Sequence, residues 1–218
     1  MRIGILGAGG MADALGTQWA AAGHEVMVSG RDPGRSAAQA ARMDAHAGAA
    51  GRVRSGTFAE SAAFGEVVVV AVREAGLLGT LRAAGERLRG KALIDVTNAA
   101  DPGAYDVTRS LARLIGDVTG GHVVKAFNLC HVDVWRMTPP AFDGRPLSVP
   151  LCGDDPRALT AARTLVADLG CVPVDGGGAE RAALLEATAA FVIGLWFGGA
   201  DAQAILPPLV SSGTHRPA

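Results

Sequence analysis

The chain has 218 residues, of which 49% are hydrophobic, and a formal net charge of −1 at pH 7. Its basic residues are scattered rather than clustered, so the charge pattern argues against a nucleic-acid or anionic-membrane partner. The three cysteines have neither metal-binding nor disulfide-dense spacing, so we predict that the protein binds no metal. Their spacing and an N-terminus without a signal-peptide pattern also predict a cytoplasmic protein.

Short apolar runs alternate with longer alanine-rich segments along the chain, which is typical of an α/β fold with a parallel sheet. We predict strands at residues 2–6, 25–29, 67–72, 92–96, 123–128, 147–152 and 171–174. We predict helices at residues 10–22, 33–45, 76–88, 105–115, 155–169 and 179–196. The uncharged stretch 187–200 inside the last helix is too short to span a membrane, which takes about 20 apolar residues.

The predicted organisation is a nucleotide-binding domain over residues 1–146, a smaller C-terminal α/β part over 147–206 and a flexible tail over 207–218. No Gly/Ser-rich linker separates the first two parts, so one continuous sheet could serve both. Residues 129–146 show no clean period, and we expect them to form a long loop over the carboxyl edge of the sheet.

The hexapeptide GAGGMA at residues 7–12 matches the GxGxxA pattern directly between the first predicted strand and helix. In that context the first glycine permits the tight turn, and the second lets a diphosphate approach the backbone. The free N–H groups of the helix N-terminus then face the phosphates. We therefore predict a Rossmann-type doubly wound sheet with a dinucleotide site. The residues expected at the dinucleotide in this turn are Gly7, Ala8, Gly9, Gly10 and Met11.

The end of the second strand indicates which dinucleotide is bound. An NAD-preferring site carries an acidic residue there, which hydrogen-bonds the ribose 2′-OH. Here Ser29 and Gly30 are followed by Arg31, with Arg35 one turn into the next helix, and Asp32 before a proline is a natural helix cap. A hydroxyl and two cations suit a 2′-phosphate, so the sequence predicts NADP(H).

Polar side chains follow three later predicted strands at the carboxyl edge of the sheet, where functional residues are expected. Asparagine and threonine can hydrogen-bond a carboxamide or a ribose without adding charge, which suits a nicotinamide and a hydride path. If the strand continues to residue 128, Ala126 and Asn128 share one face, and Lys125 and Phe127 share the other. The residues expected at the cofactor from these segments are Ala71, Val72, Arg73, Thr97, Asn98, Ala126 and Asn128.

The order GAGGMA, VSGRDP, AVREA, DVTNA, VKAFN and CGDD resembles the NADPH-dependent F-420 reductase family, the F-420:NADP oxidoreductases, over residues 2–196. The resemblance implies that Ser29 and Arg31 hold the 2′-phosphate, and that hydride passes directly between the nicotinamide and a deazaflavin. Similar domains occur in membrane ferric reductases that carry flavin. The chain departs from the family pattern at Arg73, Ala99 and Leu129, which border the second substrate.

The candidate catalytic residues are Asn128 and His131, and three functions stay open. The preferred one is hydride transfer between NADPH and F-420 or another flavin-like ring. The second is reduction of a small carbonyl, imine or enoyl compound with His131 as proton donor. The third is an NADP-binding sensor without catalysis. The C-terminal helix has more apolar surface than one sheet face buries, so we also predict a homodimer whose helix walls the acceptor site.

Overall fold

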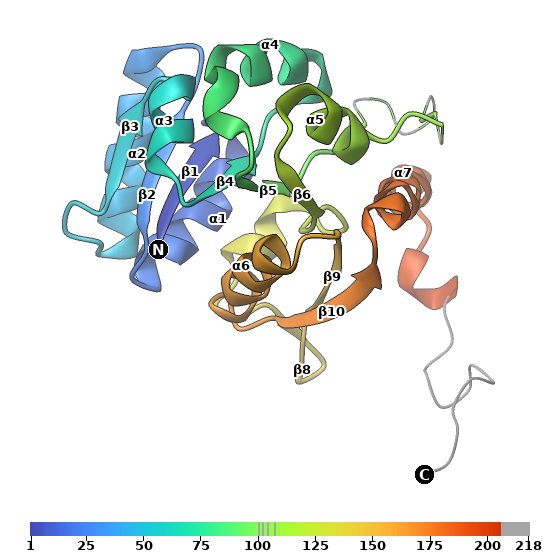
Figure 1. Ribbon diagram of the computed structural model, residues 1–218. Coiled ribbons are helices and arrows are strands. Elements are labelled where there is room, and N and C mark those ends of the chain that lie inside the picture. Colours follow the sequence, from blue (N-terminus) through green and yellow to red (C-terminus); the bar gives the residue numbers. More distant parts are fainter. Residues whose placement is uncertain (100, 102, 104, 107, 206–218) are drawn as a thin grey trace.

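The computed structural model describes residues 1–99, 101, 103, 105–106 and 108–205 (Figure 1). The tail predicted to be flexible, residues 207–218, lies outside the described residues.

An eight-stranded sheet runs through the molecule in the order β10-β9-β6-β5-β4-β1-β2-β3. It therefore takes strands from both sides of the predicted boundary at residue 146. Its strands are β1 (Arg2–Leu6), β2 (Glu25–Ser29), β3 (Val53–Gly56), β4 (Val67–Val70), β5 (Ala92–Asp95), β6 (His122–Lys125), β9 (Ser148–Cys152) and β10 (Val172–Gly177). The first six are parallel, which confirms the α/β fold class.

The last two strands correct the expectation of an entirely parallel sheet. β9 and β10 are parallel to each other, but β9 joins β6 through a single antiparallel pair, Lys125 opposite Cys152. A parallel connection normally needs a helix that crosses back over the sheet. The segment between β6 and β9 holds only a short 3-10 helix and the hairpin β7 (Ala141–Phe142) and β8 (Arg145–Pro146), so the chain re-enters the sheet in the opposite direction.

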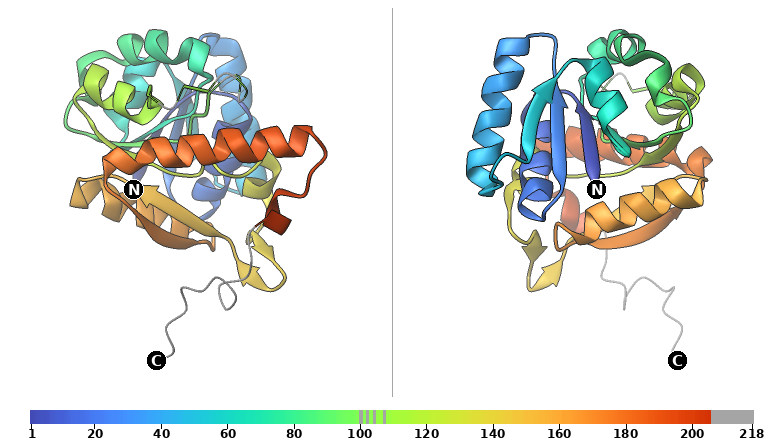
Figure 2. Two further views of the ribbon diagram at one scale, coloured as in Figure 1. Left: turned by 90° about the vertical axis from the view of Figure 1, so that its right-hand side faces the viewer. Right: turned by 60° about the vertical axis from the view of Figure 1, so that its left-hand side comes forward.

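Helices cover both faces of the sheet (Figures 1 and 2). They are α1 (Gly10–Ala21), α2 (Pro33–Ala47), α3 (Phe58–Phe64), α4 (Glu74–Ala84), α5 (Leu111–Thr119), α6 (Pro156–Ala167) and α7 (Ala182–Phe197). Side chains of α1, α2 and α6 form one core with Ile3, Ile5 and Val26, whereas α4 and α5 form the other with Leu6 and Val68. The sheet is therefore the middle layer of three, as a doubly wound fold requires.

The α5 region and the β3–α3 region also differ from the prediction. α5 spans Leu111–Thr119 instead of residues 105–115, because the Ser110 side chain caps its start and Gly120, at φ +65°, ends it. β3 and α3 were not predicted at all. Their sequence, RVRSGTFAESAAF, is short and weakly periodic, yet α3 carries a capping box in which Thr57 and Glu60 bond each other's backbone.

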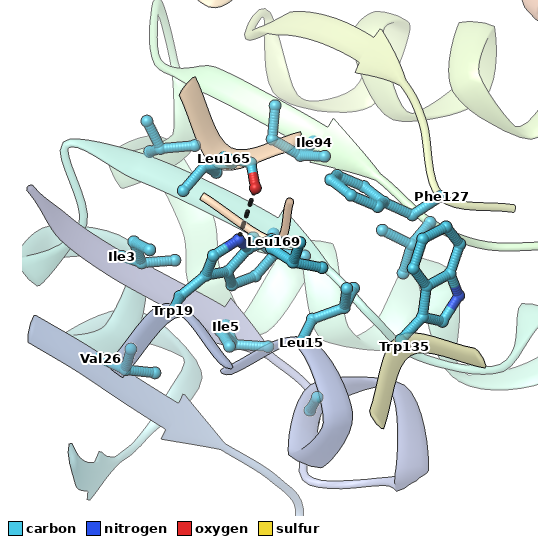
Figure 3. Packing of buried hydrophobic residues seen from close by; sticks show 14 of the residues in the cluster. Ile3, Ile5, Leu15, Trp19, Val26, Ile94, Phe127, Trp135, Leu165 and Leu169 are labelled. Atoms are coloured by element: carbon cyan, nitrogen blue, oxygen red, sulfur yellow. Dashed lines mark hydrogen bonds between the residues drawn. The ribbon is translucent and has the colours of Figure 1, made fainter. Parts of the chain in front are cut away.

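The chain breaks out of the sheet immediately after β6, earlier than the predicted strand 123–128. Phe127 adopts φ +60°, which is unusual for a bulky residue, and its ring is 2% exposed. It lies edge-on between Trp19 and Trp135, with ring centroids 5.8 and 5.3 Å away (Figure 3). Aromatic packing thus holds the left-handed turn, and the expected alternation of residues 125–128 between two faces is wrong.

The segment 129–146 is only partly the predicted loop. Residues 132–136 form a 3-10 helix that packs against α1, where Gln18 donates to the Arg136 carbonyl oxygen at 3.2 Å. The β7–β8 hairpin projects beyond β9 and β10 (Figure 1). Hence only the first residues of this segment remain at the carboxyl edge of the parallel strands.

α7 crosses one side of the molecule as a long bar (Figure 2). Its residues are almost all apolar, and Leu184, Phe191 and Phe197 are more than half exposed. Within the part of the chain that the structure describes, no helix combines the length and the apolar character needed to cross a membrane.

Candidate active site

The glycine turn after β1 has the geometry that a bound dinucleotide requires. Gly7 adopts φ +140° and its N–H donates to the Ser29 carbonyl oxygen at 2.8 Å, which joins the turn to the end of β2. A Cβ at Gly7 would lie 2.2 Å from the Ala71 carbonyl oxygen, so only glycine fits. A Cβ at Gly9, in contrast, would meet no protein atom within 4 Å. The space above Gly9 is therefore open to a ligand.

The N-terminus of α1 supplies unpaired donors to that space. Gly9 is the N-cap residue and has no side chain to satisfy the first N–H groups, and both Gly9 and Gly10 are exposed. Free N–H groups and the positive end of the helix dipole attract a diphosphate. This observation fits a dinucleotide at the predicted residues.

The β2–α2 turn separates the predicted 2′-phosphate residues into two groups. Arg31 and Arg35 are exposed, and the Asp32 side chain caps α2 by accepting from the Arg35 N–H at 3.0 Å, as predicted. Ser29 is fully buried, and its hydroxyl donates to the Ile5 carbonyl oxygen at 2.8 Å. The side chain of Ser29 is thus committed to joining β1 and β2, which corrects the expectation that it faces a phosphate.

Gly30 is the residue at which the β2–α2 turn approaches the glycine turn after β1. A Cβ there would come within 2.8 Å of the Ser36 hydroxyl oxygen and 3.2 Å of the Ala8 Cβ. The close approach brings Ala8 of the glycine turn next to the start of α2, so the diphosphate and 2′-phosphate regions adjoin.

A cavity of about 690 Å³ lies at the carboxyl ends of β1, β4, β5 and β6. Ten predicted site residues line it: Gly9, Gly10, Met11, Ala71, Val72, Arg73, Thr97, Asn98, Asn128 and His131. Seven do not line it: Gly7, Ala8, Ser29, Gly30, Arg31, Arg35 and Ala126. Ala126 is fully buried in the core, so the expectation that it contacts the cofactor is corrected.

Eight lining residues were absent from the predicted site: Val96, Phe127, Leu129, Cys130, Val132, Ile193, Trp196 and Phe197. The last three belong to α7, which the sequence had suggested as a wall without indicating which residues face inward. Of the others, Leu129 was expected from the family resemblance to border the second substrate. The remaining four are apolar neighbours of predicted residues, and their type gave no sign of a site.

Two side-chain amides link the carboxyl ends of β5 and β6 inside the cavity. The amide nitrogen of Asn98 donates to the Asn128 carbonyl oxygen at 2.7 Å, and the amide nitrogen of Asn128 donates to Asn98 Oδ1 at 3.0 Å and to the Leu185 carbonyl oxygen at 3.1 Å. Asn128 is 3% exposed, and its Oδ1 has no hydrogen-bond partner within the described residues. A buried oxygen without a partner is costly unless a ligand donates to it.

His131 stands at the rim of the cavity, with 71% of its side chain exposed. Its Nδ1 accepts from the Asp133 N–H at 3.4 Å and lies 3.3 Å from Asp133 Oδ2. The first contact requires an unprotonated Nδ1 and the second a protonated one, so the two contacts favour opposite tautomers of the ring. Among the described residues that line the cavity, the basic side chains are Arg73 and His131, and none of the lining residues is an aspartate or a glutamate.

Cys130 gives a pH-dependent prediction for the cavity wall. Burial raises the pKa of its thiol to about 11, because the thiolate is poorly solvated there. Below this pKa each pH unit raises the thiolate fraction about tenfold. We expect iodoacetamide to alkylate Cys130 slowly at pH 8 and about tenfold faster at pH 9, measured by mass spectrometry of its peptide. Equal rates at the two pH values in the folded protein would contradict this, and denatured protein provides the fast-reacting control.

The chain matches known proteins in sequence and in structure. A family model described as NADP oxidoreductase, coenzyme F-420-dependent, matches residues 2–99. The crystal structure of a candidate F-420-dependent NADP reductase from Arthrobacter sp. FB24 is 30% identical, covers 92% of this chain and 96% of that chain, and has a TM-score of 0.74. An imine reductase of Streptomyces aurantiacus, 17% identical, covers 90% of this chain and 62% of that chain with a TM-score of 0.67, which shows a shared fold.

A longer relative is Metalloreductase STEAP3 of Rattus norvegicus, which is 30% identical over 198 residues. The match covers 89% of this chain but 38% of that protein, so the chain spans well under half of its length.

The fold and the glycine turn define a Rossmann-type dinucleotide-binding protein. The chain belongs to the F-420-dependent NADP oxidoreductase family, as its sequence motifs predicted. It is accordingly an NADP-dependent oxidoreductase.

Proposed function

We propose that the protein transfers hydride between NADPH and F-420 or another flavin-like ring. The observation that carries this proposal is the lining of the cavity, which combines the open glycine turn, the Asn98 and Asn128 amides and the aromatic residues Trp196 and Phe197 of α7. The names of the matched family and of the Arthrobacter protein support the same acceptor.

The residues divide into cofactor and acceptor groups. The backbone of the glycine turn binds the diphosphate, and Arg31 and Arg35 bind the 2′-phosphate. The unpartnered Oδ1 of Asn128 accepts from the nicotinamide carboxamide, which fixes the orientation of the ring. NADPH supplies a hydride, so the acceptor ring gains two electrons and takes up any further proton from water. Thr97 and Asn98 add neutral polar contacts near this point.

The acceptor lies against the apolar residues of α7 and of the segment after β6. Trp196 and Phe197 offer flat, exposed aromatic surface at the cavity, which suits a planar heterocycle. Hydride transfer depends on close and oriented approach more than on charge, so a site without a catalytic carboxylate is adequate. This division assigns residues 1–146 to the cofactor, apart from the apolar residues of the segment after β6, which contact the acceptor together with α7 within 147–206.

The direct test is anaerobic oxidation of NADPH by the purified protein, with F-420, FMN, FAD and a ferric chelate offered in parallel and NADH as the control donor. Rapid turnover of NADPH with F-420 or a flavin supports the proposal. Binding of NADPH without oxidation by any of the four acceptors contradicts it and favours either a specialised organic substrate or the sensor function.

A second function, imine or carbonyl reduction, is favoured by one observation. His131 is exposed at the rim of the cavity, where a protonated ring nitrogen can donate its proton to the nitrogen or oxygen atom of an imine or carbonyl that receives the hydride. We expect His131→Ala to change turnover of a deazaflavin or flavin less than about threefold. The same variant should slow an imine or carbonyl substrate about a hundredfold or more, within the range of general acid catalysis. Steady-state kinetics with both substrate classes measure the difference. Equal large losses with both classes would contradict the proposed division of roles.

We also propose a cytoplasmic homodimer that covers the outer side of α7, where Leu184 and Phe191 are 54% and 60% exposed. Light scattering should give twice the chain mass. A monomer at micromolar concentration would exclude this arrangement.

A further inference from the structure

Three charged side chains form a cluster behind the cavity, and none of them is exposed. Lys125 Nζ lies 2.9 Å from Asp95 Oδ2 and 3.5 Å from Glu186 Oε1, and it also donates to the Thr97 carbonyl oxygen. Asp95 in turn accepts from the N–H and the hydroxyl of Thr97 at 2.8 and 2.7 Å. Thr97 lines the cavity, so the cluster directly supports one of its polar walls.

Glu186 connects this cluster to two helices. Its carboxylate accepts from the N–H groups of Leu111 and Ala112 at 3.0 Å each, which satisfies the start of α5. Ser110 and Tyr105 donate to it through their hydroxyls at 3.2 and 3.4 Å. Burial and the Glu186 carboxylate raise the pKa of Tyr105 to about 12, so this hydroxyl stays protonated as a donor.

α7 has few other anchors: Ala182 and the half-buried Leu185 pack against Ala112, Val123 and Cys152, and the Tyr105 hydroxyl donates to the Ala183 carbonyl oxygen at 3.1 Å. Its buried residues are Glu186 and two alanines, Ala182 and Ala189, whose methyl groups bury only a small apolar area. The preceding carbonyl oxygen, that of Leu185, receives the Asn128 amide, so the same turn of α7 also orients a residue of the cavity.

The helical repeat places the acceptor wall on the Glu186 side of α7. Ile193 follows Glu186 by seven residues and Phe197 by eleven, which are close to two and three full turns. Both residues line the cavity. The rotation of α7 about its axis, which the Glu186 contacts fix, therefore decides where these side chains point.

We propose that Glu186 is a positioning residue for the acceptor side of the site: its buried carboxylate ties α7 to Lys125 and α5 and thereby holds Ile193 and Phe197 in the cavity wall. This proposal rests on the proposed function for its kinetic consequence, but its structural consequence is independent of any reaction. In the proposed function the phosphates of NADPH bind the glycine turn, Arg31 and Arg35, and these charge-assisted contacts dominate its affinity. None of these residues is among the hydrogen-bond or ion-pair partners of Glu186 within the described residues.

The test is Glu186→Gln, which removes the charge and keeps one of the two oxygens, so that it can accept from the N–H of either Leu111 or Ala112 but not from both. Loss of one charge-assisted contact corresponds to about tenfold in an equilibrium. We expect the backbone amides of α7 to exchange hydrogen about tenfold faster or more, and the KM for the flavin-like acceptor to rise about tenfold. The Kd for NADPH should change less than about twofold.

Glu180→Gln is the matched control, because it makes the same chemical change at an exposed position just before α7. It should leave all three quantities unchanged. Glu186→Asp keeps the charge on a shorter side chain, so its acceptor KM should lie between those of the unmodified protein and Glu186→Gln. If Glu186→Gln does not fold, Glu186→Asp replaces it in both measurements.

The proposal would be overturned if the α7 amides of Glu186→Gln exchanged hydrogen at the unchanged rate. It would also be overturned if the NADPH Kd and the acceptor KM rose by the same factor. Hydrogen exchange needs no turnover, so it tests the positioning role even if no acceptor is reduced and the proposed function fails.

Discussion

Replacing Gly9 with valine is expected to weaken NADPH and NADH binding equally, by about a hundredfold or more, in a protein that folds normally. Gly9 is extended, at φ −101° and ψ −169°, and a Cβ there meets no protein atom within 4 Å. The added side chain occupies the space that the diphosphate needs beside the N-terminus of α1. Losing one or two charge-assisted hydrogen bonds to phosphate accounts for a change of this size.

Fluorescence titration with each nucleotide measures the effect, and thermal unfolding confirms the fold. Gly79→Val is the matched control, because Gly79 is exposed in α4, has equally open surroundings and does not line the cavity. Normal NADPH affinity in Gly9→Val would show that the diphosphate does not lie over this turn.

Arg31→Ala is expected to weaken NADPH about tenfold to a hundredfold and to leave NADH nearly unchanged. Arg31 is exposed after β2, and its planar guanidinium can bond the 2′-phosphate twice. The carboxylate of the next residue, Asp32, caps α2 by accepting from the Arg35 N–H. A charge-assisted hydrogen bond contributes roughly 1.5 to 3 kcal/mol, which sets this range. Because the site is exposed, the difference should shrink at high salt.

The ratio of the NADPH and NADH dissociation constants is the decisive measurement. Arg163→Ala removes the same charge from the exposed side of α6 and should leave the ratio unchanged. Equal losses for both nucleotides in Arg31→Ala would assign Arg31 to a different part of the cofactor. Because the Ser29 hydroxyl is buried against β1, Arg35 is the remaining predicted residue that can bind the 2′-phosphate. The double variant Arg31→Ala, Arg35→Ala should therefore lose more NADPH affinity than either single variant.

Much of the cofactor side could be predicted from the sequence because its physics is local. A strand, a glycine turn and a helix N-terminus are encoded within the first dozen residues, and their geometry in the structure agrees with the pattern at Gly7 and Gly9. The presence of Ser29 instead of an acid at the end of β2, and of Arg31 two residues later, is equally local. The environment of Ser29 was less predictable, because its hydroxyl bonds a strand that lies 24 residues away in sequence.

The acceptor side depended on contacts between distant segments. Whether Ile193, Trp196 and Phe197 face the cavity is decided by the rotation of α7, and that rotation follows from Glu186, Lys125 and the start of α5. The apolar sequence of α7 has no polar face that would mark which side turns inward. The end of β6 is similar, since Phe127 leaves the strand only because Trp19 and Trp135 enclose its ring.

The sequence by itself determined the α/β class, the position of the dinucleotide turn and the preference for NADP, since each follows from residues close together in the chain. The tertiary structure alone decided the antiparallel entry of β9, the buried charge cluster and the composition of the acceptor wall. Those features arise where side chains from four or more elements compete for the same interior space, and their outcome is set by packing and by the pairing of buried charges.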